Sequence, residues 1–240
     1  MKILLTGHKG FIGSHVYEHL TRIGYDVDGL DRPDDIGDFT GVQGDYDILI
    51  HLAAYAALRD SVKNPNKFWE NNVEKSQPIF DYCRKYNVRL LYASSAGAHS
   101  WWQNPYAITK KVNEIQAPPN SVGMRFFNVW AEKGSREDML YRMLQDNTAE
   151  YLTRHKRDWI HVHDVVRAIC YLIPDKFRGV LDIGTGRNYS VLELAMRMGK
   201  SDLPILEDTP GEPDSLCADT TQLTKLGWFP TIDIMDLLHG

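Results

Sequence analysis

The stretch "KILLTGHKGFIGSH" (2–15) joins a short apolar run to a glycine-rich turn and then to a pattern with apolar residues on one helical face. The apolar run (2–6) predicts a buried strand, and "FIGSHVYEHLTRI" (11–23) predicts an amphipathic helix. The next segment, "YDVDGLD" (25–31), predicts a second strand that ends in an acid. A strand, a helix and a strand in this order form a βαβ unit, which predicts a parallel sheet.

The rest of the chain continues this alternation of strands and helices. We therefore expect an α/β fold with a Rossmann-type doubly wound parallel sheet. Beyond about residue 184, a helical pattern, a proline-rich stretch and a second capped helix predict a small C-terminal lobe. The further strands expected are 47–53, 88–95, 121–127, 159–162 and 179–184, and the further helices are 66–86, 105–117, 136–146 and 164–173.

The composition excludes several classes of function. The 240 residues carry a formal net charge of −5, which gives no attraction to phosphate backbones or anionic membranes, so we expect no nucleic acid and no membrane partner. The longest apolar run, "ILIHLAAYAAL" (48–58), is too short to span a bilayer. The three cysteines lie far apart and form no CxxC, which is typical of reduced thiols in a cytoplasmic protein.

The glycine-rich turn has the features of a dinucleotide site. Gly7, Gly10 and Gly13 allow a tight turn, a close approach of backbone N–H groups to a pyrophosphate, and a close contact between helix and strand. Asp31, at the end of the second strand, can hold the ribose hydroxyls of the adenosine. Its charge favours NAD over NADP, although Arg32 beside it leaves NADP open. An ordinary turn between a strand and a helix is the alternative interpretation.

Two histidine patterns raise the question of a metal. "HVYEH" (15–19) matches a zinc-protease spacing, and "HVHD" (161–164) places two histidines on one strand face. The first follows the glycine turn directly, and no third ligand with supporting spacing is evident. We therefore expect no metal site.

A tyrosine and a lysine lie four positions apart in "NPYAITK" (104–110). Asn104 is a good N-cap and Pro105 a good first helical residue, so Tyr106 and Lys110 would share one helix face. A lysine ammonium near a phenol lowers the pKa of that phenol and makes it usable as a base. Ser95 ends the preceding strand, where it could offer a hydroxyl to a substrate. With 12 tyrosines in the chain, the spacing alone also arises by chance.

The motifs that follow one another along the chain resemble those of a known family. The sequence is similar to the extended short-chain dehydrogenase/reductases, in particular the NAD-dependent nucleotide-sugar epimerase/dehydratase group, over nearly its whole length. The motifs that carry the resemblance are "TGHKGFIGSH", "LD" at 30–31, "DILIHLAA", "NPNKFWENNV", "LLYASSA", "PYAITK", "RFFNVWA", "RDWIHVHDVVRAI", "DIGTG" and "ADTTQLTKLGW".

The resemblance assigns roles to particular residues. It implies that Tyr106 is the catalytic base, that Lys110 holds the nicotinamide ribose and tunes Tyr106, and that Ser95 bonds the sugar hydroxyl. Asn128 and Arg157 would contact the nucleotide sugar. Asn72 could instead brace its own helix, and Arg157 could be a solvated member of a basic cluster. The cofactor-binding set that we expect is Gly7, Gly10, Phe11, Ile12, Gly13, Asp31, Arg32, Asp38, Phe39, Leu52, Ala53, Ala54, Asn72, Ser94, Tyr106 and Lys110.

The same resemblance implies that the chain has two parts with different functions. Residues 1–129 and 158–183 would form the NAD-binding Rossmann domain. Residues 130–157 and 184–240 would form the small substrate-binding lobe. The helices 66–86 and 105–117 form a dimeric four-helix bundle in similar proteins, so we expect a homodimer.

The residues after Ser95 bear on which reaction the chain performs. Dehydratases of this group have Asp-Glu after the catalytic hydroxyl residue, whereas this chain has Ala96 and Gly97. A nucleotide-sugar 4-epimerase, acting on a UDP-sugar through a transient 4-keto intermediate with a tyrosine base, is therefore our leading hypothesis. A 4-reductase that uses NAD(P)H and a non-catalytic dinucleotide-binding module are the alternatives.

The sequence departs from the family pattern in three places. The segment between residue 31 and the strand at 47–53 is short, a feature shared with the 4-reductases. Tyr106 follows Ser95 by only eleven positions, so the substrate-lining loop is trimmed, and Trp101 and Trp102 could rebuild one wall, cover apolar surface or contact a second subunit. Basic residues expected near "PGE" (210–212) are replaced by "PDSLC", which leaves Arg157 or Arg187 for the diphosphate.

Overall fold

The fold was determined from a computed structural model, which describes residues 1–32, 36–39, 46–137, 139–207 and 211–237. The chain packs as two compact units: Met1–Arg125 with Val166–Leu181, and Phe126–Val165 with Asp182–Gly240. These boundaries place 158–165 and Asn128 with the second unit, whereas the sequence-based division placed them with the first. The functional division into lobes stays a prediction.

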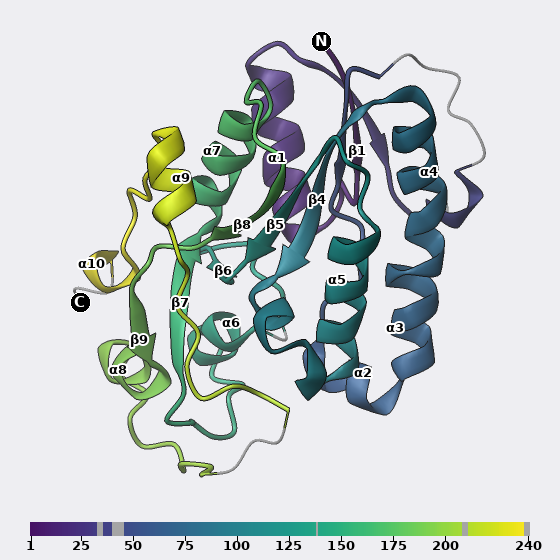
Figure 1. The fold of residues 1–240 in the computed structure, drawn as a ribbon. Coiled ribbons are helices and arrows are strands. Elements are labelled where there is room, and N and C mark those ends of the chain that lie inside the picture. Colours follow the sequence, from purple (N-terminus) through teal and green to yellow (C-terminus); the bar gives the residue numbers. More distant parts are fainter. Residues whose placement is uncertain (33–35, 40–45, 138, 208–210, 238–240) are drawn as a thin grey trace. The chain divides into compact units, whose positions relative to one another are not determined.

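A six-stranded parallel sheet dominates the fold (Figure 1). Its strand order is β2-β1-β3-β4-β5-β8. The chain runs from β1 to β2 at one edge of the sheet and then crosses back, so that β3 pairs with the other side of β1. This reversal is typical of doubly wound sheets, and it confirms the predicted fold class. The strands are β1 (Lys2–Thr6), β2 (Asp26–Leu30), β3 (Ile48–His51), β4 (Arg89–Ser95), β5 (Ser121–Phe126) and β8 (Gly179–Ile183).

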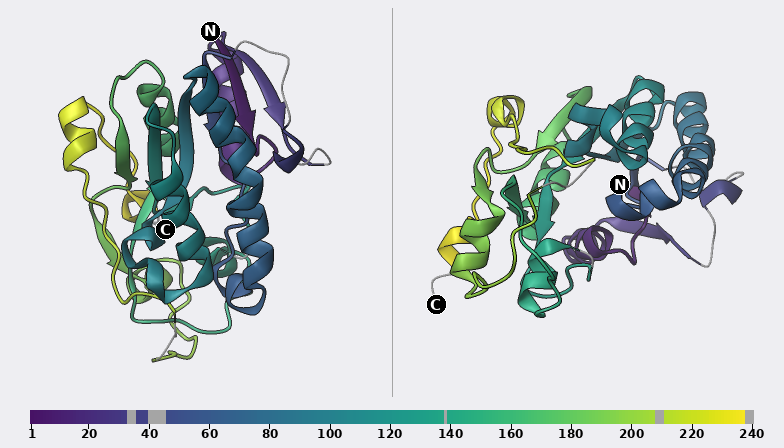
Figure 2. Two further views of the ribbon diagram at one scale, coloured as in Figure 1. Left: turned by 45° about the vertical axis from the view of Figure 1, so that its right-hand side comes forward. Right: turned by 90° about the horizontal axis from the view of Figure 1, so that it is seen from below.

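The inner strands are buried on both faces, because helices cover both. All four residues of β3 are buried, and Ile3 of β1 pairs with Ile48 of β3, which in turn pairs with Arg89 of β4. Helices α1 (Phe11–Arg22) and α7 (Val162–Leu172) lie on one side of these strands, and α3 (Pro65–Asn72), α4 (Gln77–Tyr86) and α5 (Pro105–Gln116) lie on the other (Figures 1 and 2).

The helix predicted over 66–86 is interrupted. Helix α3 ends at Asn72, a 3₁₀ turn follows at Glu74–Ser76, and α4 begins at Gln77. Pro78 explains the second start, because proline has no N–H to donate within a helix and favours its first turn. The prediction of one continuous helix was therefore wrong.

The strand predicted at 159–162 does not join the main sheet. It forms part of β7 (Lys156–His161), which lies between β6 (Asn128–Trp130) and β9 (Asn188–Ser190) in a second, three-stranded sheet. Its pairing is parallel with β6 and antiparallel with β9. Short strands such as β6 and β9 have too few residues to show a periodicity, which is why the sequence did not predict them.

The second unit has its own apolar core beside this small sheet. Trp130 and Trp159 are fully buried there and pack with side chains of α6 (Leu140–Gln145) and α8 (Val191–Arg197). Helix α8 begins with a capping box in which Ser190 and Glu193 bond each other's backbone N–H groups. The remaining short helices are α2 (Leu58–Lys63), α9 (Thr221–Leu226) and α10 (Ile234–Leu237).

Candidate functional site

The glycine turn between β1 and α1 has the geometry that its sequence predicts. Gly7 has a φ of +76°, a conformation that side-chain-bearing residues rarely adopt, and its N–H donates to the carbonyl of Leu30 in β2 (2.8 Å). A Cβ at Gly7 would lie 2.7 Å from the backbone nitrogen of Ala53, and one at Gly13 would lie 2.0 Å from the Gly7 carbonyl oxygen. The turn therefore tolerates no side chain at either position.

The N-terminus of α1 fits a phosphate group. Gly10 is its N-cap in an extended conformation, with no side-chain hydrogen bond to the helix and no acidic residue in the first turn. The helix is 12 residues long and begins directly after Gly10. The partial positive charge of its first turn therefore lies at the glycine turn. Phe11 and Ile12 are the first two residues of this helix, and their contact with a cofactor stays a prediction.

Asp31 lies beside this turn, directly after β2. Its Oδ2 accepts from the backbone N–H of Lys9 (2.7 Å), and its Oδ1 accepts from the N–H of Arg32 (2.8 Å). Each carboxylate oxygen has two lone pairs, so both can still accept from a ribose hydroxyl. The Arg32 guanidinium lies 5.0 Å from the centroid of the Tyr55 ring, in cation–π contact.

The backbone after β3 forms the other wall of the turn. The N–H of Leu52 donates to the Thr6 carbonyl (3.1 Å), and the N–H of Ala53 donates to the Thr6 hydroxyl (3.3 Å). Ala54 follows in the same extended segment. Leu52 and Ala53 thus lie directly against Gly7, and their contact with a cofactor stays a prediction.

Phe39 and Asp38, two further residues of the predicted cofactor set, lie at the short turn after β2. Phe39 is a core residue, which packs among Leu49, Phe80 and their neighbours and meets the Tyr82 ring edge-on. Asp38 lies in the short 3₁₀ turn Ile36–Asp38, but its side chain lies outside the described part of the chain.

Asn72 braces the loop that follows β3. Its Oδ1 accepts from the Tyr55 N–H (2.8 Å), and its Nδ2 donates to the Tyr55 carbonyl (2.9 Å) and to the Thr109 hydroxyl of α5 (3.2 Å). The side chain is 1% exposed. Asn72 thus fixes the loop that borders the glycine turn. It braces this loop and α5 rather than its own helix, which was the alternative raised by the sequence, and its cofactor role stays a prediction.

The three predicted catalytic residues come from consecutive elements. Ser95 ends β4 and caps the 3₁₀ segment η3 (Ala96–Gln103), its hydroxyl accepting from the N–H of Gly97 (3.2 Å). Asn104 caps α5 by accepting from the N–H of Ala107 (2.8 Å), with Pro105 next, as predicted. Tyr106 is the second residue of that helix, and its N–H donates to the hydroxyl of Ser61 in α2 (3.1 Å).

Lys110 is the most unusual group of the site. Its side chain is buried, its ammonium lies 5.9 Å from the centroid of the Tyr106 ring, and it donates to the carbonyl of Ala93 in β4 (2.9 Å). Burial lowers the pKa of this ammonium to about 8. Lys110 is thus a cation held one helical turn from the phenol, as its spacing predicted.

A buried polar chain beneath the site was not predicted. Thr6 and Ser76 flank the imidazole of His51, with Oγ1–Nδ1 and Oγ–Nε2 distances of 2.7 and 3.0 Å, and Ser76 also donates to the carbonyl of Asn72 (2.9 Å). Burial, with a smaller contribution from the Lys110 charge, lowers the pKa of His51 to about 3, so the ring is neutral. The signal available in the sequence was a histidine within an otherwise apolar strand.

Ser94, another member of the predicted cofactor set, bonds a residue of α5. It is buried, and its hydroxyl donates to Glu114 of α5 (2.6 Å), which also pairs with Arg125 of β5. Sequence reasoning missed Glu114, although it lies one turn beyond Lys110 on the same helix face.

The two residues predicted to contact the sugar lie in the second unit. Asn128 begins β6 and pairs with Trp159 of β7. The guanidinium of Arg157 is buried and donates to the carbonyl of Pro213 (2.8 Å), and it bonds His155 (2.9 Å) and Glu212 (3.3 Å). Arg157 is thus already engaged within its own unit and is not part of a solvated basic cluster.

Neither histidine pattern assembles a metal site in the described residues, where no group of three His, Cys, Asp or Glu side chains could hold an ion. His15 bonds the Phe11 carbonyl (2.8 Å), and His19 bonds Arg22 (2.9 Å). Within the same described ranges, no helix has both the length and the apolar character needed to cross a bilayer.

A family model and several known proteins match the sequence of this chain. The model of the NAD dependent epimerase/dehydratase family matches residues 3–184. A UDP-glucose 4-epimerase of Lactobacillus helveticus is 27% identical over 98% of this chain and 94% of its own length. That alignment spans 315 positions against the 240 residues here, so the relative contains segments that this chain lacks.

Solved structures share the fold. MoeE5, in complex with UDP-glucuronic acid and NAD, superposes with a TM-score of 0.86 at 26% identity over 99% of this chain and 96% of its own. TunA, an NAD-dependent NDP-hexosamine 5,6-dehydratase, superposes with a TM-score of 0.87 at 23% identity over 99% and 95%. The glycine turn, Asp31 and the Tyr106–Lys110 pair fit NAD, and the chain belongs to the NAD-dependent epimerase/dehydratase family.

Proposed function

We propose that this protein is a nucleotide-sugar 4-epimerase that acts on a UDP-sugar with NAD as its resident cofactor. The observation that carries the proposal is the Tyr106–Lys110 pair, in which a buried cation lies beside the Tyr106 ring and bonds Ala93 of β4, the strand that Ser95 ends. The residues after that serine are Ala96 and Gly97, neither of which has an acid or base for the elimination of water.

The reaction needs few groups from the protein. Bound NAD supplies a reversible hydride acceptor for the sugar carbon C4. Tyr106 Oη takes the proton of the 4-hydroxyl as C4 is oxidised, while the Ser95 hydroxyl bonds the same sugar oxygen. The positive charge of Lys110 stabilises the phenolate form of Tyr106. After the 4-keto sugar has turned over, Tyr106 returns the proton as C4 is reduced on its other face.

Other parts of the assignment belong to the same proposal. Asp31 and the backbone of the glycine turn would hold the adenosine ribose and the pyrophosphate, and Asn128 would contact the sugar nucleotide. Arg157 would organise the segment around Pro213 rather than bind the diphosphate itself, because its donors are engaged there. We also propose a homodimer in the cytoplasm, where Cys83, Cys170 and Cys217 remain the free thiols that the structure shows.

A screen of nucleotide sugars with the purified protein tests the proposal. We expect UDP-glucose and UDP-galactose, or their N-acetyl forms, to interconvert without added cofactor, and mass analysis after denaturation to find NAD. Strict dependence on added NADPH would identify the 4-reductase instead. Tyr106→Phe is the control: it should retain bound NAD and lose activity by about three orders of magnitude or more. Unchanged function in that variant would indicate a non-catalytic dinucleotide-binding module.

A further inference from the structure

Helix α5 is joined to the end of β4 at two successive points. Lys110 donates to the carbonyl of Ala93, and Glu114, one turn further on, accepts from the hydroxyl of Ser94 (2.6 Å). The next residue of β4 is Ser95. The helix face that presents Tyr106 is therefore held to the two residues that precede the catalytic serine.

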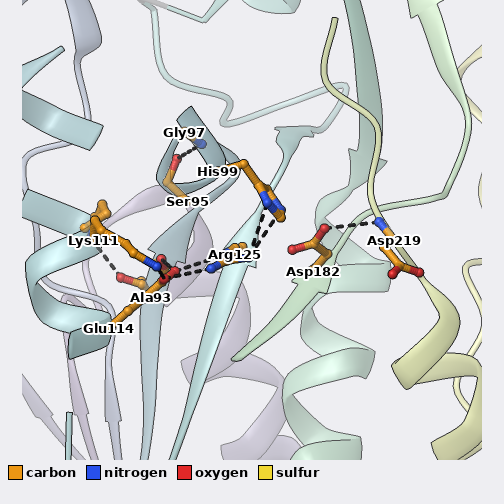
Figure 3. Close-up of polar contacts among 11 residues, drawn as sticks. Ala93, Ser95, Gly97, His99, Lys111, Glu114, Arg125, Asp182 and Asp219 are labelled. Atoms are coloured by element: carbon orange, nitrogen blue, oxygen red, sulfur yellow. Dashed lines mark hydrogen bonds and ion pairs between the residues drawn. The ribbon is translucent and has the colours of Figure 1, made fainter. Parts of the chain in front are cut away.

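Glu114 is held in turn by an arginine from the neighbouring strand. Arg125 of β5 forms a two-pronged ion pair with it, with Nε–Oε1 and Nη2–Oε2 distances of 2.7 and 2.8 Å (Figure 3). The Glu114 side chain is only 3% exposed. Burial opposes its ionisation, but hydrogen bonds from Arg125 and Ser94 more than offset this effect and keep the pKa of Glu114 below its ordinary value. Paired forks of this kind are rigid in both distance and orientation.

The same arginine reaches the connection between the two catalytic elements. Arg125 Nη1 lies 3.3 and 3.4 Å from the two ring nitrogens of His99, in η3. This segment leads from Ser95 to Tyr106, and it is the stretch that is trimmed relative to the family pattern. Arg125 therefore contacts both Glu114 of α5 and His99 of η3. Glu114 in turn contacts both Ser94 of β4 and Arg125 of β5.

We propose that Glu114 and Arg125 form a positioning pair that fixes Ser95 of β4 against Tyr106 and Lys110 of α5. The proposal rests on the proposed function, because the three aligned groups are the ones that perform the proton transfer there. Neither Glu114 nor Arg125 touches the reacting atoms. Their effect is on distance and alignment, to which proton transfer is steeply sensitive.

Glu114→Gln tests the pair with little change in shape. The amide keeps an acceptor for Ser94 and removes the charge that Arg125 binds. We expect kcat to fall by about 10- to 100-fold while KM for the sugar stays within about threefold and NAD is retained. Arg125→Lys, which keeps the charge, should recover part of the kcat lost in Arg125→Met.

Arg89→Lys is the matched control, since Arg89 is a buried arginine at the start of β4, the strand that ends at Ser95. Its guanidinium donates to the carbonyls of Leu172 (3.0 Å) and Phe177 (3.2 Å). We expect this variant to lower the urea midpoint without lowering kcat. A wild-type kcat in Glu114→Gln, or an equal loss of kcat in Arg89→Lys at equal destabilisation, overturns the proposal.

Hydrogen exchange separates this proposal from the proposed function. We expect Glu114→Gln to exchange faster at 93–97 and 105–112, and Arg89→Lys to leave these segments unchanged. A wild-type protein that converts no nucleotide sugar refutes the epimerase assignment. In that case unchanged exchange in Glu114→Gln refutes the positioning pair as well, whereas faster exchange supports it.

Discussion

At the scale of single residues, the central feature is a charge that the fold places in a costly environment. Lys110 is 3% exposed, and its ammonium donates to the carbonyl of Ala93 in β4. A buried ammonium destabilises the folded state unless it is compensated. Under the proposed function, its place beside Tyr106 is a requirement of catalysis rather than of folding.

Lys110→Met should separate these two requirements. Methionine fills a similar volume without the charge, so we expect kcat to fall at least about 100-fold while the free energy of unfolding at pH 7 rises by roughly 1–2 kcal/mol. The folded protein binds fewer protons than the unfolded chain between pH 8 and 10.5, so wild-type stability should rise with pH there relative to the variant. Urea titrations of both proteins across this window measure the difference. A variant less stable than wild type at pH 7 would contradict this account of Lys110.

Gly13→Ala tests the packing of the glycine turn. Because the added Cβ would lie 2.0 Å from the Gly7 carbonyl oxygen, the turn must shift. We expect a loss of roughly 2–4 kcal/mol in the free energy of unfolding and protein purified without NAD. Ser14→Ala, the next residue of the same helix, is the control and should keep both. Wild-type NAD content in Gly13→Ala would show that the turn does not require this close contact.

At the scale of elements, local signals predicted α5 well and failed where long-range pairing decides. Asn104 and Pro105 mark the start of α5 in the sequence, and the structure has the same cap. No local pattern shows which sheet a strand joins, so β7 was expected in the main sheet. For the same reason the sequence did not predict the role of Glu114, which is defined by an arginine from another strand, or the packing of Phe39, which belongs to a core that assembles only in the fold.

The Thr6–His51–Ser76 chain joins β1, β3 and the turn before α4, and it should make the fold sensitive to acid. The pKa of His51 is about 3 in the folded protein against 6.5 as the ordinary value, so the unfolded chain binds more protons between these limits. Stability should therefore fall as the pH drops from 6.5 towards 3. We expect the urea midpoint of His51→Gln to fall less over this window than that of wild type. Equal slopes in His51→Gln and wild type would contradict this account of His51.

At the scale of the whole molecule, the chain keeps the fold of its family and lacks segments that a longer relative has. The exposed apolar side chains of the first unit are a further clue to its assembly. Val62, Trp69 and Ile115 are 56%, 42% and 74% exposed on α2, α3 and α5, which pack against one another. Large apolar side chains exposed on neighbouring helices favour a surface that meets another protein.

Ile115→Glu tests the proposed homodimer. A carboxylate on a helix that packs against its copy would be buried without a partner, so we expect the variant to be a monomer by light scattering where the wild type is a dimer. Met196→Glu is the control, because Met196 is 68% exposed on α8 of the other unit. A dimer in both variants would place the interface elsewhere.

The fate of a deuterium label at C4 tests the central claim most directly. A 4-epimerase returns to the same carbon the hydride that it removed, because a hydride held on a bound cofactor does not exchange with water. Purified protein with C4-deuterated UDP-glucose, or its N-acetyl form, and no added cofactor should yield the C4 epimer with its deuterium retained, as read by NMR. An epimer that has lost the label, or no epimer until NADPH is supplied, would contradict the assignment of this chain as an epimerase.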